Sequence, residues 1–227
     1  MKTIVFGTHD KRLELNSNIH PIPLKKVMPD YLKKIKIDKK NLNFKSCPSY
    51  IDIFKYGYAL LAPCDLNIQI LENGTLNWKT GSVFQTTTSE FDIHTNDQFI
   101  SYTPENFDMK AIIKYNYPFK VFTPKGYSCR QIPLPLQYND QWEVFEGILR
   151  TDKIHHIHLQ LIIKTNNNIL IEQGTPLAVF VPFKREKFKS KIININSNNK
   201  YGKKYNKEYL KYYGKFKPNY INEGYFK

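Results

Sequence analysis

Histidine is the residue type whose spacing in this chain is best suited to chemistry. His155, His156 and His158 fall within four consecutive positions. Because side chains alternate between the two faces of a β-strand, a strand here places His156 and His158 on one face and His155 on the other. Two imidazoles on one face can ligate a divalent metal ion, and a catalytic centre adds a third protein ligand and an open position. The alternative is a polar strand face whose histidines bind no metal.

A third metal ligand has to come from elsewhere in the chain, because residues 159–164 carry no carboxylate. A divalent metal ion is nevertheless the cofactor class that the histidine pair suggests. The candidates for the third ligand are Glu143, Glu146, Asp152, His94 and a cysteine.

The cysteines Cys47, Cys64 and Cys129 are widely spaced and form no CxxC pair, so neither a disulfide framework nor a structural zinc site is indicated. Cys129 precedes Arg130, and a thiol beside a guanidinium is a candidate nucleophile. Cysteine is also a common packing residue. No Cys–His–acid spacing can be argued, so we assign no catalytic residue. Arg130 and Arg150 are candidate ligand-binding residues for a pocket near the histidines.

Positive charge gathers at the C-terminal end. The chain has 34 Lys or Arg and 20 Asp or Glu, a net charge of +14, and residues 183–227 hold 13 of the basic residues against 3 Glu. Tyrosines in this region are spaced by four, four and three residues, which predicts one face of a helix with lysines beside it. The expected contact residues are Tyr201, Lys204, Tyr205, Tyr209, Lys211 and Tyr212.

Three interpretations of this basic arm are open. Tyrosines interleaved with lysines can stack on the bases of a nucleic acid while the lysines neutralise its phosphates. The tyrosine face can instead dock on the chain's own body while the lysines reach into water. In the third interpretation, the arm contacts a protein partner or a second copy of the chain.

The elements that must position these residues are mainly β. Leu66, Ile68 and Ile70 alternate with polar residues, and a second alternating run follows Asn73-Gly74, which predicts a hairpin with a type I′ turn. A short helix is expected over residues 49–57. Further strands are expected over residues 91–93, 99–102, 111–115, 119–122, 127–132, 144–149, 154–164, 169–171 and 177–181.

Many short strands separated by turns predict a mainly β fold, a distorted barrel or sandwich with a few short helices. We expect three regions. Residues 1–57 form an irregular and helical segment packed on the body, because three prolines forbid long regular structure there. Residues 58–183 form the β-rich domain, and residues 184–227 form the basic arm.

Residues 123–183 resemble the β-clip fold of dUTPases and dCTP deaminases. The matching segments are Thr123-Pro-Lys-Gly-Tyr-Ser, Glu146-Gly-Ile-Leu-Arg-Thr-Asp and Ile171-Glu-Gln-Gly-Thr-Pro-Leu-Ala-Val-Phe-Val-Pro-Phe. The resemblance implies a β-clip-like centre. It transfers no catalytic role, because Arg150 stands where the dUTPase pattern has its catalytic Asp, and the phosphate motif and the glycine-rich C-terminal lid are missing.

The whole chain also resembles a protein family of tailed phages and some bacteria to which no activity is assigned. Ser46-Cys-Pro-Ser-Tyr-Ile-Asp-Ile-Phe, Leu61-Ala-Pro-Cys-Asp and Val181-Pro-Phe-Lys-Arg-Glu-Lys-Phe carry this resemblance. It implies a viral or bacterial origin.

These observations favour a non-catalytic binding or structural β-domain with a basic interaction arm, whose partner is a protein or a second copy of the chain, or a nucleic acid bound by the arm. The alternative is a metal- or nucleotide-dependent enzyme of β-clip or cupin-like type with its pocket near His156 and His158. No apolar run has the roughly 20 residues of a membrane span, and no signal peptide is recognisable. We therefore expect no membrane partner and a cytoplasmic location, in the host cytoplasm or the virion if the chain is viral.

Overall fold

The structure is a computed structural model, and it describes residues 2–36, 52–82, 84, 90–94, 98, 109–193, 195 and 199–213, with side chains up to residue 207. The chain divides into two compact units. The first is Met1–Pro29 with Ile53–Arg185, and the second is Asp30–Asp52 with Glu186–Lys227. The expected fold class is confirmed, because antiparallel strands in three sheets make up most of the regular structure.

The described strands are β1 (Val5–Gly7), β2 (Ile22–Pro23), β3 (Tyr58–Leu61), β4 (Leu66–Ile70), β5 (Leu76–Thr80), β6 (Phe91–His94), β7 (Ala111–Phe122), β8 (Tyr127–Ile132), β9 (Trp142–Val144), β10 (Gly147–Leu149), β11 (His156–Ile163), β12 (Ile169–Ile171) and β13 (Pro176–Lys184). The described α-helices are α1 (Lys11–Leu15), α2 (Asp30–Lys34) and α4 (Lys200–Tyr213). Short 3-10 helices are η1 (Ser17–Ile19), η2 (Leu24–Val27) and η4 (Asp52–Lys55). None of the helices in the described part of the chain is long and apolar enough to cross a membrane.

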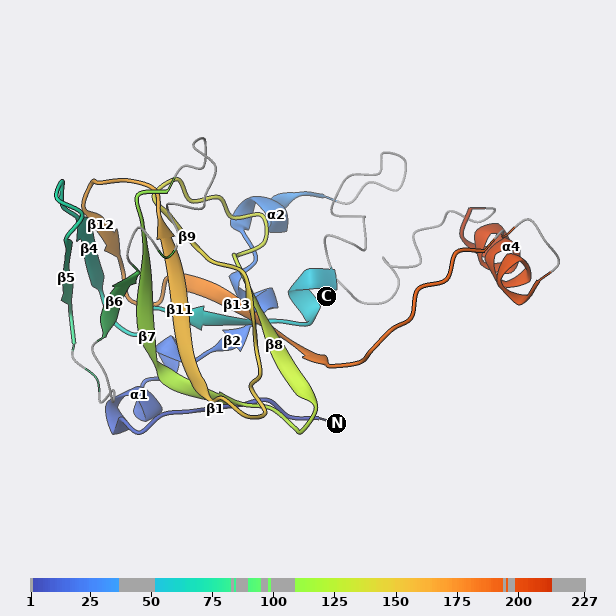
Figure 1. Cartoon of the computed structure of the whole chain (residues 1–227), viewed down its shortest axis with the longest axis horizontal. Coiled ribbons are helices and arrows are strands. Elements are labelled where there is room, and N and C mark those ends of the chain that lie inside the picture. Colours follow the sequence, from blue (N-terminus) through green and yellow to red (C-terminus); the bar gives the residue numbers. More distant parts are fainter. Residues whose placement is uncertain are drawn as a thin grey trace. The chain divides into compact units, whose positions relative to one another are not determined.

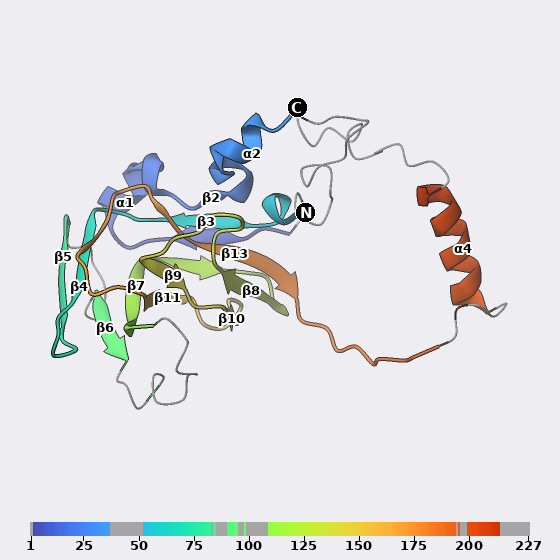
Figure 2. The same ribbon diagram turned by 90° about the horizontal axis from the view of Figure 1, so that it is seen from above.

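The strands of the first unit form a distorted sandwich. One sheet has the order β1-β7-β11-β9 with β6 also paired to β7, and a second has the order β10-β8-β13-β3-β2. The third sheet is β12-β4-β5. Figure 1 shows β7 and β11 side by side and running steeply across β3 and β13, and Figure 2 shows the same elements from above. Neither five-stranded sheet closes on itself among the described strands, so the sandwich form of the prediction is confirmed and the barrel form is not.

The core lies between the sheets. Ile157, Leu159 and Leu161 alternate along β11 and are almost fully buried, as period-two burial requires. Tyr117 on β7 is buried with them, and its hydroxyl donates to the Leu61 carbonyl of β3 at 2.8 Å. This bond satisfies a buried hydroxyl and ties the first sheet to the second.

The predicted hairpin is present, but its turn differs from the prediction. β4 and β5 pair with Ile70 opposite Leu76, as the alternation requires. A type I′ turn needs positive φ at both central residues. Here only Gly74 has positive φ, at 78°, and its N–H donates to the Leu71 carbonyl. The loop is therefore a three-residue connection with glycine in the left-handed position, and not a two-residue type I′ turn.

Two predicted strand boundaries are wrong. Residues 111–115 and 119–122 belong to one strand, β7, which runs through Pro118. Proline has no N–H to donate, and Pro118 lies where the register with β11 shifts, a position that strands tolerate. Residues 144–149 are instead split between β9 and β10, which belong to different sheets, so the chain passes from one sheet to the other at residues 145–146. The strand expected over residues 99–102 lies outside the described residues.

The N-terminal segment also contributes strands, which the prolines did not suggest. β1 pairs with the end of β7, and β2 pairs with β3. Of the helix expected over residues 49–57, the described part contains only η4. Gly57 follows it, and a Cβ there would lie 2.8 Å from a Val179 methyl, so glycine permits this close approach.

Candidate metal and partner-binding sites

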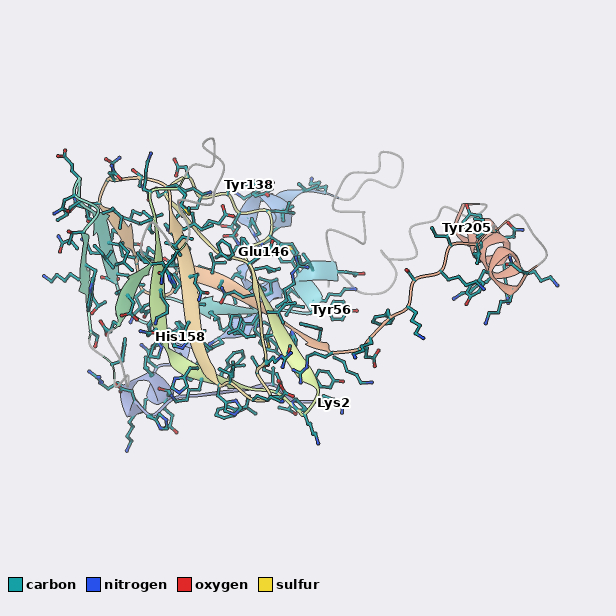
Figure 3. All side chains as sticks on the ribbon, viewed as in Figure 1. Lys2, Tyr56, Tyr138, Glu146, His158 and Tyr205 are labelled. Atoms are coloured by element: carbon teal, nitrogen blue, oxygen red, sulfur yellow. The ribbon has the colours of Figure 1, made fainter. Side chains whose placement is uncertain are left out.

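His156 and His158 lie on the outward face of the first sheet. In the register of β11 with β7, His158 is opposite Asn116 and His156 is opposite Lys120. His156 is exposed and His158 is half-buried, while Ile157 between them is buried. The alternation therefore places both histidines on one face, as expected from their spacing (His158 is labelled in Figure 3).

The two imidazole rings are nearly parallel. Their planes differ by 8° and their centroids lie 6.1 Å apart. No group of three or more His, Cys, Asp or Glu side chains that could hold a metal ion occurs among the residues the structure describes. The geometry thus offers two imidazoles, and not the three-ligand set of a typical catalytic zinc site.

Asn116 and Asp92 form a chain of hydrogen bonds that leads to His158. The Asn116 amide nitrogen Nδ2 donates to Asp92 Oδ2 at 3.2 Å, and Asn116 Oδ1 lies 2.6 Å from His158 Nδ1. Asn116 is 5% exposed, so this chain of hydrogen bonds is partly sheltered from water. Lys114 forms an ion pair with Asp92 at 2.8 Å, and that contact, first through its hydrogen bond, lowers the pKa of the Asp92 carboxyl.

The surroundings of the histidine pair favour neutral imidazoles. Burial, and then the charge of Lys114, lower the pKa of His158. Burial, and then Lys120, lower the pKa of His156. A lowered pKa favours the neutral imidazole, which is the form that ligates metals.

His155 takes no part in this face. Its ring stacks on Phe122 with centroids 4.2 Å apart, and its Nδ1 lies 3.1 Å from the Val121 carbonyl oxygen. It serves the packing of the turn that leads into β11.

The side chains proposed as a third ligand have other partners. Each is held in a hydrogen bond or ion pair away from the histidine pair. The pairs are Glu143 with Lys164 at 2.5 Å, Glu146 with Arg130 at 2.7 Å, Asp152 with Arg185, and His94 with Gln98 at 3.1 Å.

Arg130 and Arg150 do not join the histidines in one site. Arg130 is on β8 in the second sheet, where its ion pair with Glu146 is exposed. Arg150 is exposed and follows β10, and its carbonyl accepts the N–H groups of Lys153 and Ile154 in the turn before β11.

The described cysteines are packing residues. Cys129 is fully buried, and burial raises the pKa of its thiol to about 11. The Thr151 hydroxyl lies 3.6 Å from its sulfur. Cys64 is also buried, and burial raises its pKa. A thiol that stays protonated is a poor nucleophile, so the environment argues against catalysis by Cys129. Cys47 lies outside the described residues.

The tyrosine-rich segment forms the helix α4, as the spacing predicted. Asn199 caps it, because its side-chain Oδ1 accepts the N–H groups of Tyr201 and Gly202 at 3.0 and 2.8 Å. Tyr201 is 50% exposed and Tyr205 is 47% exposed (Tyr205 is labelled in Figure 3). The Lys200 ammonium lies 5.0 Å from the centroid of the Tyr201 ring.

The C-terminal half of the predicted contact surface is described by its backbone. Tyr209, Lys211 and Tyr212 lie within α4, and their side chains are outside the described part.

A pocket of about 350 Å³ is lined by none of His156, His158, Arg130 and Arg150, although Glu143, a candidate third metal ligand, is in its wall. Leu136 in its wall has φ of 59°, a left-handed conformation that costs a non-glycine residue about 1–2 kcal/mol. The lining residues are Pro133, Leu134, Leu136, Gln137, Tyr138, Asn139, Trp142, Glu143, Val144, Lys164, Thr175, Pro176 and Leu177.

Sequence reasoning missed Asn116 and Asp92. Asn116 falls between two segments that the sequence predicts as separate strands. The prediction therefore assigned Asn116 to no strand face. Had residues 111–122 been treated as one strand, Lys114, Asn116 and Lys120 would have appeared on one face by parity. Asp92 comes from a separate strand, and only the tertiary pairing of β6 with β7 brings it there.

A scan against protein-family models finds no match, and a search of curated proteins finds none either.

Proposed function

We propose that this chain is a non-catalytic binding protein whose β-sandwich carries a basic arm, and that helix α4 of the arm binds single-stranded nucleic acid. The observation that carries the proposal is the surface of α4. Half-exposed Tyr201 and Tyr205 stand one helical turn apart, next to lysines at 200, 203, 204 and 207. Tyrosine rings offer stacking platforms to unpaired bases, and ammonium groups contact phosphates.

The test measures the binding of fluorescein-labelled oligo(dT) and poly(U) to the full-length protein. Fluorescence anisotropy gives the affinity at each of a series of salt concentrations. Affinity should fall steeply with salt, with a slope of about −0.7 for each phosphate contact. Combining Tyr201→Ala with Tyr205→Ala should weaken binding at least tenfold, because base stacking contributes about 1–3 kcal/mol per base.

Tyr138→Ala is the matched control. This tyrosine is 93% exposed and belongs to the first unit, so its removal should leave binding unchanged. If the double variant retains wild-type affinity, or if the control loses as much, the arm is not the nucleic-acid surface.

A second candidate is a protein partner, including a second copy of the chain. Phe188 and Ile192, in the segment before α4, are 87% and 99% exposed. Exposed apolar side chains in an extended segment suit a protein interface better than a phosphate backbone. Light scattering on the full-length protein measures the mass directly, and a mass of 26.8 kDa across the accessible concentration range excludes self-association.

The alternative of a metal- or nucleotide-dependent enzyme has less support. His156 and His158 share β11 in the first sheet, but Arg130 lies on β8 in the second sheet and Arg150 lies in the turn after β10. The carboxylates proposed as ligands are engaged in ion pairs. The relationships to β-clip enzymes and to phage proteins stay predictions.

A further inference from the structure

The outward face of β11 and β7 carries a second arrangement that the basic arm does not explain. His158, Asn116 and Asp92 form a line of side chains across three neighbouring strands, β11, β7 and β6. Each contact in the line is polar and short, and none of the three residues is needed to fill the apolar core on the opposite face.

The hydrogen bonds determine the orientation of the Asn116 amide. A carboxylate only accepts hydrogen bonds, so the Asn116 group that faces Asp92 Oδ2 at 3.2 Å must be the NH₂. The amide oxygen is then directed at His158 Nδ1 at 2.6 Å, and an amide oxygen only accepts. His158 must therefore donate from Nδ1, which leaves the lone pair of the neutral ring on Nε2.

This is the arrangement that supports a metal-binding histidine. In metal sites the second ring nitrogen donates to a carboxylate or carbonyl group, which fixes the tautomer and the ring orientation. His158 has such a support in Asn116, which is nine-tenths buried and is in turn held by Asp92.

His156 is placed to supply a second ligand. It lies two residues along the strand on the same face, with its ring parallel to that of His158 and centroids 6.1 Å apart. Metal–nitrogen bonds of about 2.0–2.1 Å at a tetrahedral ion require nitrogens roughly 3.3 Å apart. The rings must converge for this, and His156 is the exposed member of the pair, free of the hydrogen bond that holds His158.

We propose that His158, through Nε2, and His156 chelate a divalent transition-metal ion of the imidazole-binding class, with Asn116 and Asp92 as positioning residues. Zn²⁺, Ni²⁺ and Cu²⁺ belong to this class, and Cu²⁺ should bind tightest by the general order of divalent affinities. Two protein ligands leave the remaining positions of the ion to water. Lys114 does not oppose the ion with an uncompensated charge, because it is paired with Asp92.

The experiment uses untagged full-length protein and Ni²⁺ and Zn²⁺ in calorimetric titrations. We expect one site of this kind per chain, a loss of at least tenfold in affinity for His156→Ala or His158→Ala, and a loss of about 10–100-fold for Asn116→Ala. His155→Ala is the matched control. The His155 ring stacks on Phe122 and takes no part in the face that carries His156 and His158, so this variant should bind as the wild type does. Unchanged binding in the His156 and His158 variants, or an equal loss in the control, overturns the proposal.

A metal-free measurement tests the support independently. Nitrogen-15 spectra of the histidine rings should show His158 in the tautomer protonated at Nδ1, and Asn116→Ala should shift it toward the tautomer protonated at Nε2. A wild-type His158 already protonated at Nε2 contradicts the assigned orientation, whatever the titrations show. Neither measurement depends on the basic arm, so both test the metal site independently of the proposed nucleic-acid binding.

Discussion

At the scale of single residues, Asp152 is a charged group that several hydrogen bonds hold in place. Its side chain is 3% exposed and forms an ion pair with Arg185. It also accepts the Gly126 N–H at 2.9 Å. Arg185 in turn donates to the Tyr127 carbonyl at 2.7 Å. These bonds hold the end of β13 against the turn between β7 and β8. The apolar side chains of the strands make no such link.

We predict that Asp152→Asn lowers the thermal midpoint by several degrees at pH 7 and that this difference narrows as the pH falls below about 4. The hydrogen bond from Arg185, then that from Gly126, lower the pKa of the Asp152 carboxyl in the folded protein. A lowered pKa means that the folded state binds fewer protons than the unfolded state near this pH. The contribution is therefore complete above the unfolded pKa of about 3.9, declines as the pH falls below that value, and is fully lost only below the folded-state pKa.

The measurement is a pair of thermal melts, wild type against variant, from pH 7 down to pH 3. Other carboxyl groups titrate in both proteins and cancel in the difference. Asp140→Asn, in an exposed turn, serves as the control and should show no gap at any pH. If the difference in thermal midpoint between the wild type and Asp152→Asn stays constant from pH 7 to pH 3, the pKa of Asp152 is not lowered in the folded protein.

At the scale of elements, the sequence predicts most where burial is strictly periodic. The alternation of Leu66, Ile68 and Ile70 gave the strand β4, its face and its hairpin partner. It did not give the turn type, because Asn73-Gly74 fits both a two-residue turn and a longer loop with glycine last. The histidine face was predictable from parity alone, whereas its Asn116–Asp92 support depends on which strands pair.

We predict that Gly74→Ala costs about 1–2 kcal/mol of unfolding free energy, because alanine is strained in the left-handed conformation. Gly74 has φ of 78°, and a Cβ there meets no atom within 4 Å, so only the backbone term is changed. For a chain of this length the loss corresponds to roughly 2–8 °C in the thermal midpoint.

Gly147→Ala is the matched control for this turn. A Cβ at Gly147 also meets nothing within 4 Å, but its φ is not positive, so alanine should be neutral or slightly stabilising. If the two substitutions change the free energy of unfolding equally, in urea or thermal unfolding, the positive φ of Gly74 is not the cause of the cost.

At the scale of the whole molecule, the division into two units has a direct consequence for stability. The main apolar cluster is drawn entirely from residues of the first unit, from Leu13 to Phe180. The first unit ends at Arg185, whose ion pair with Asp152 is internal to it. Composition predicted an arm beginning at residue 184, but it could not show that Arg185 belongs to the body, because one more basic residue looks like any other in a basic run.

We therefore predict that a chain ending at Lys187 melts within about 2 °C of the full-length protein, a difference worth roughly 0.5 kcal/mol. A chain ending at Lys184 should melt several degrees lower, because it loses Arg185 and leaves Asp152 as a poorly hydrated charge. Fluorescence of Trp142, which is 6% exposed and belongs to the apolar cluster, reports unfolding of this unit. If both shortened chains melt together, well below full length, residues beyond 187 stabilise the sandwich and the two units are not independent. If both melt with the full-length protein, the Arg185 ion pair contributes nothing, and the strands alone hold the end of β13.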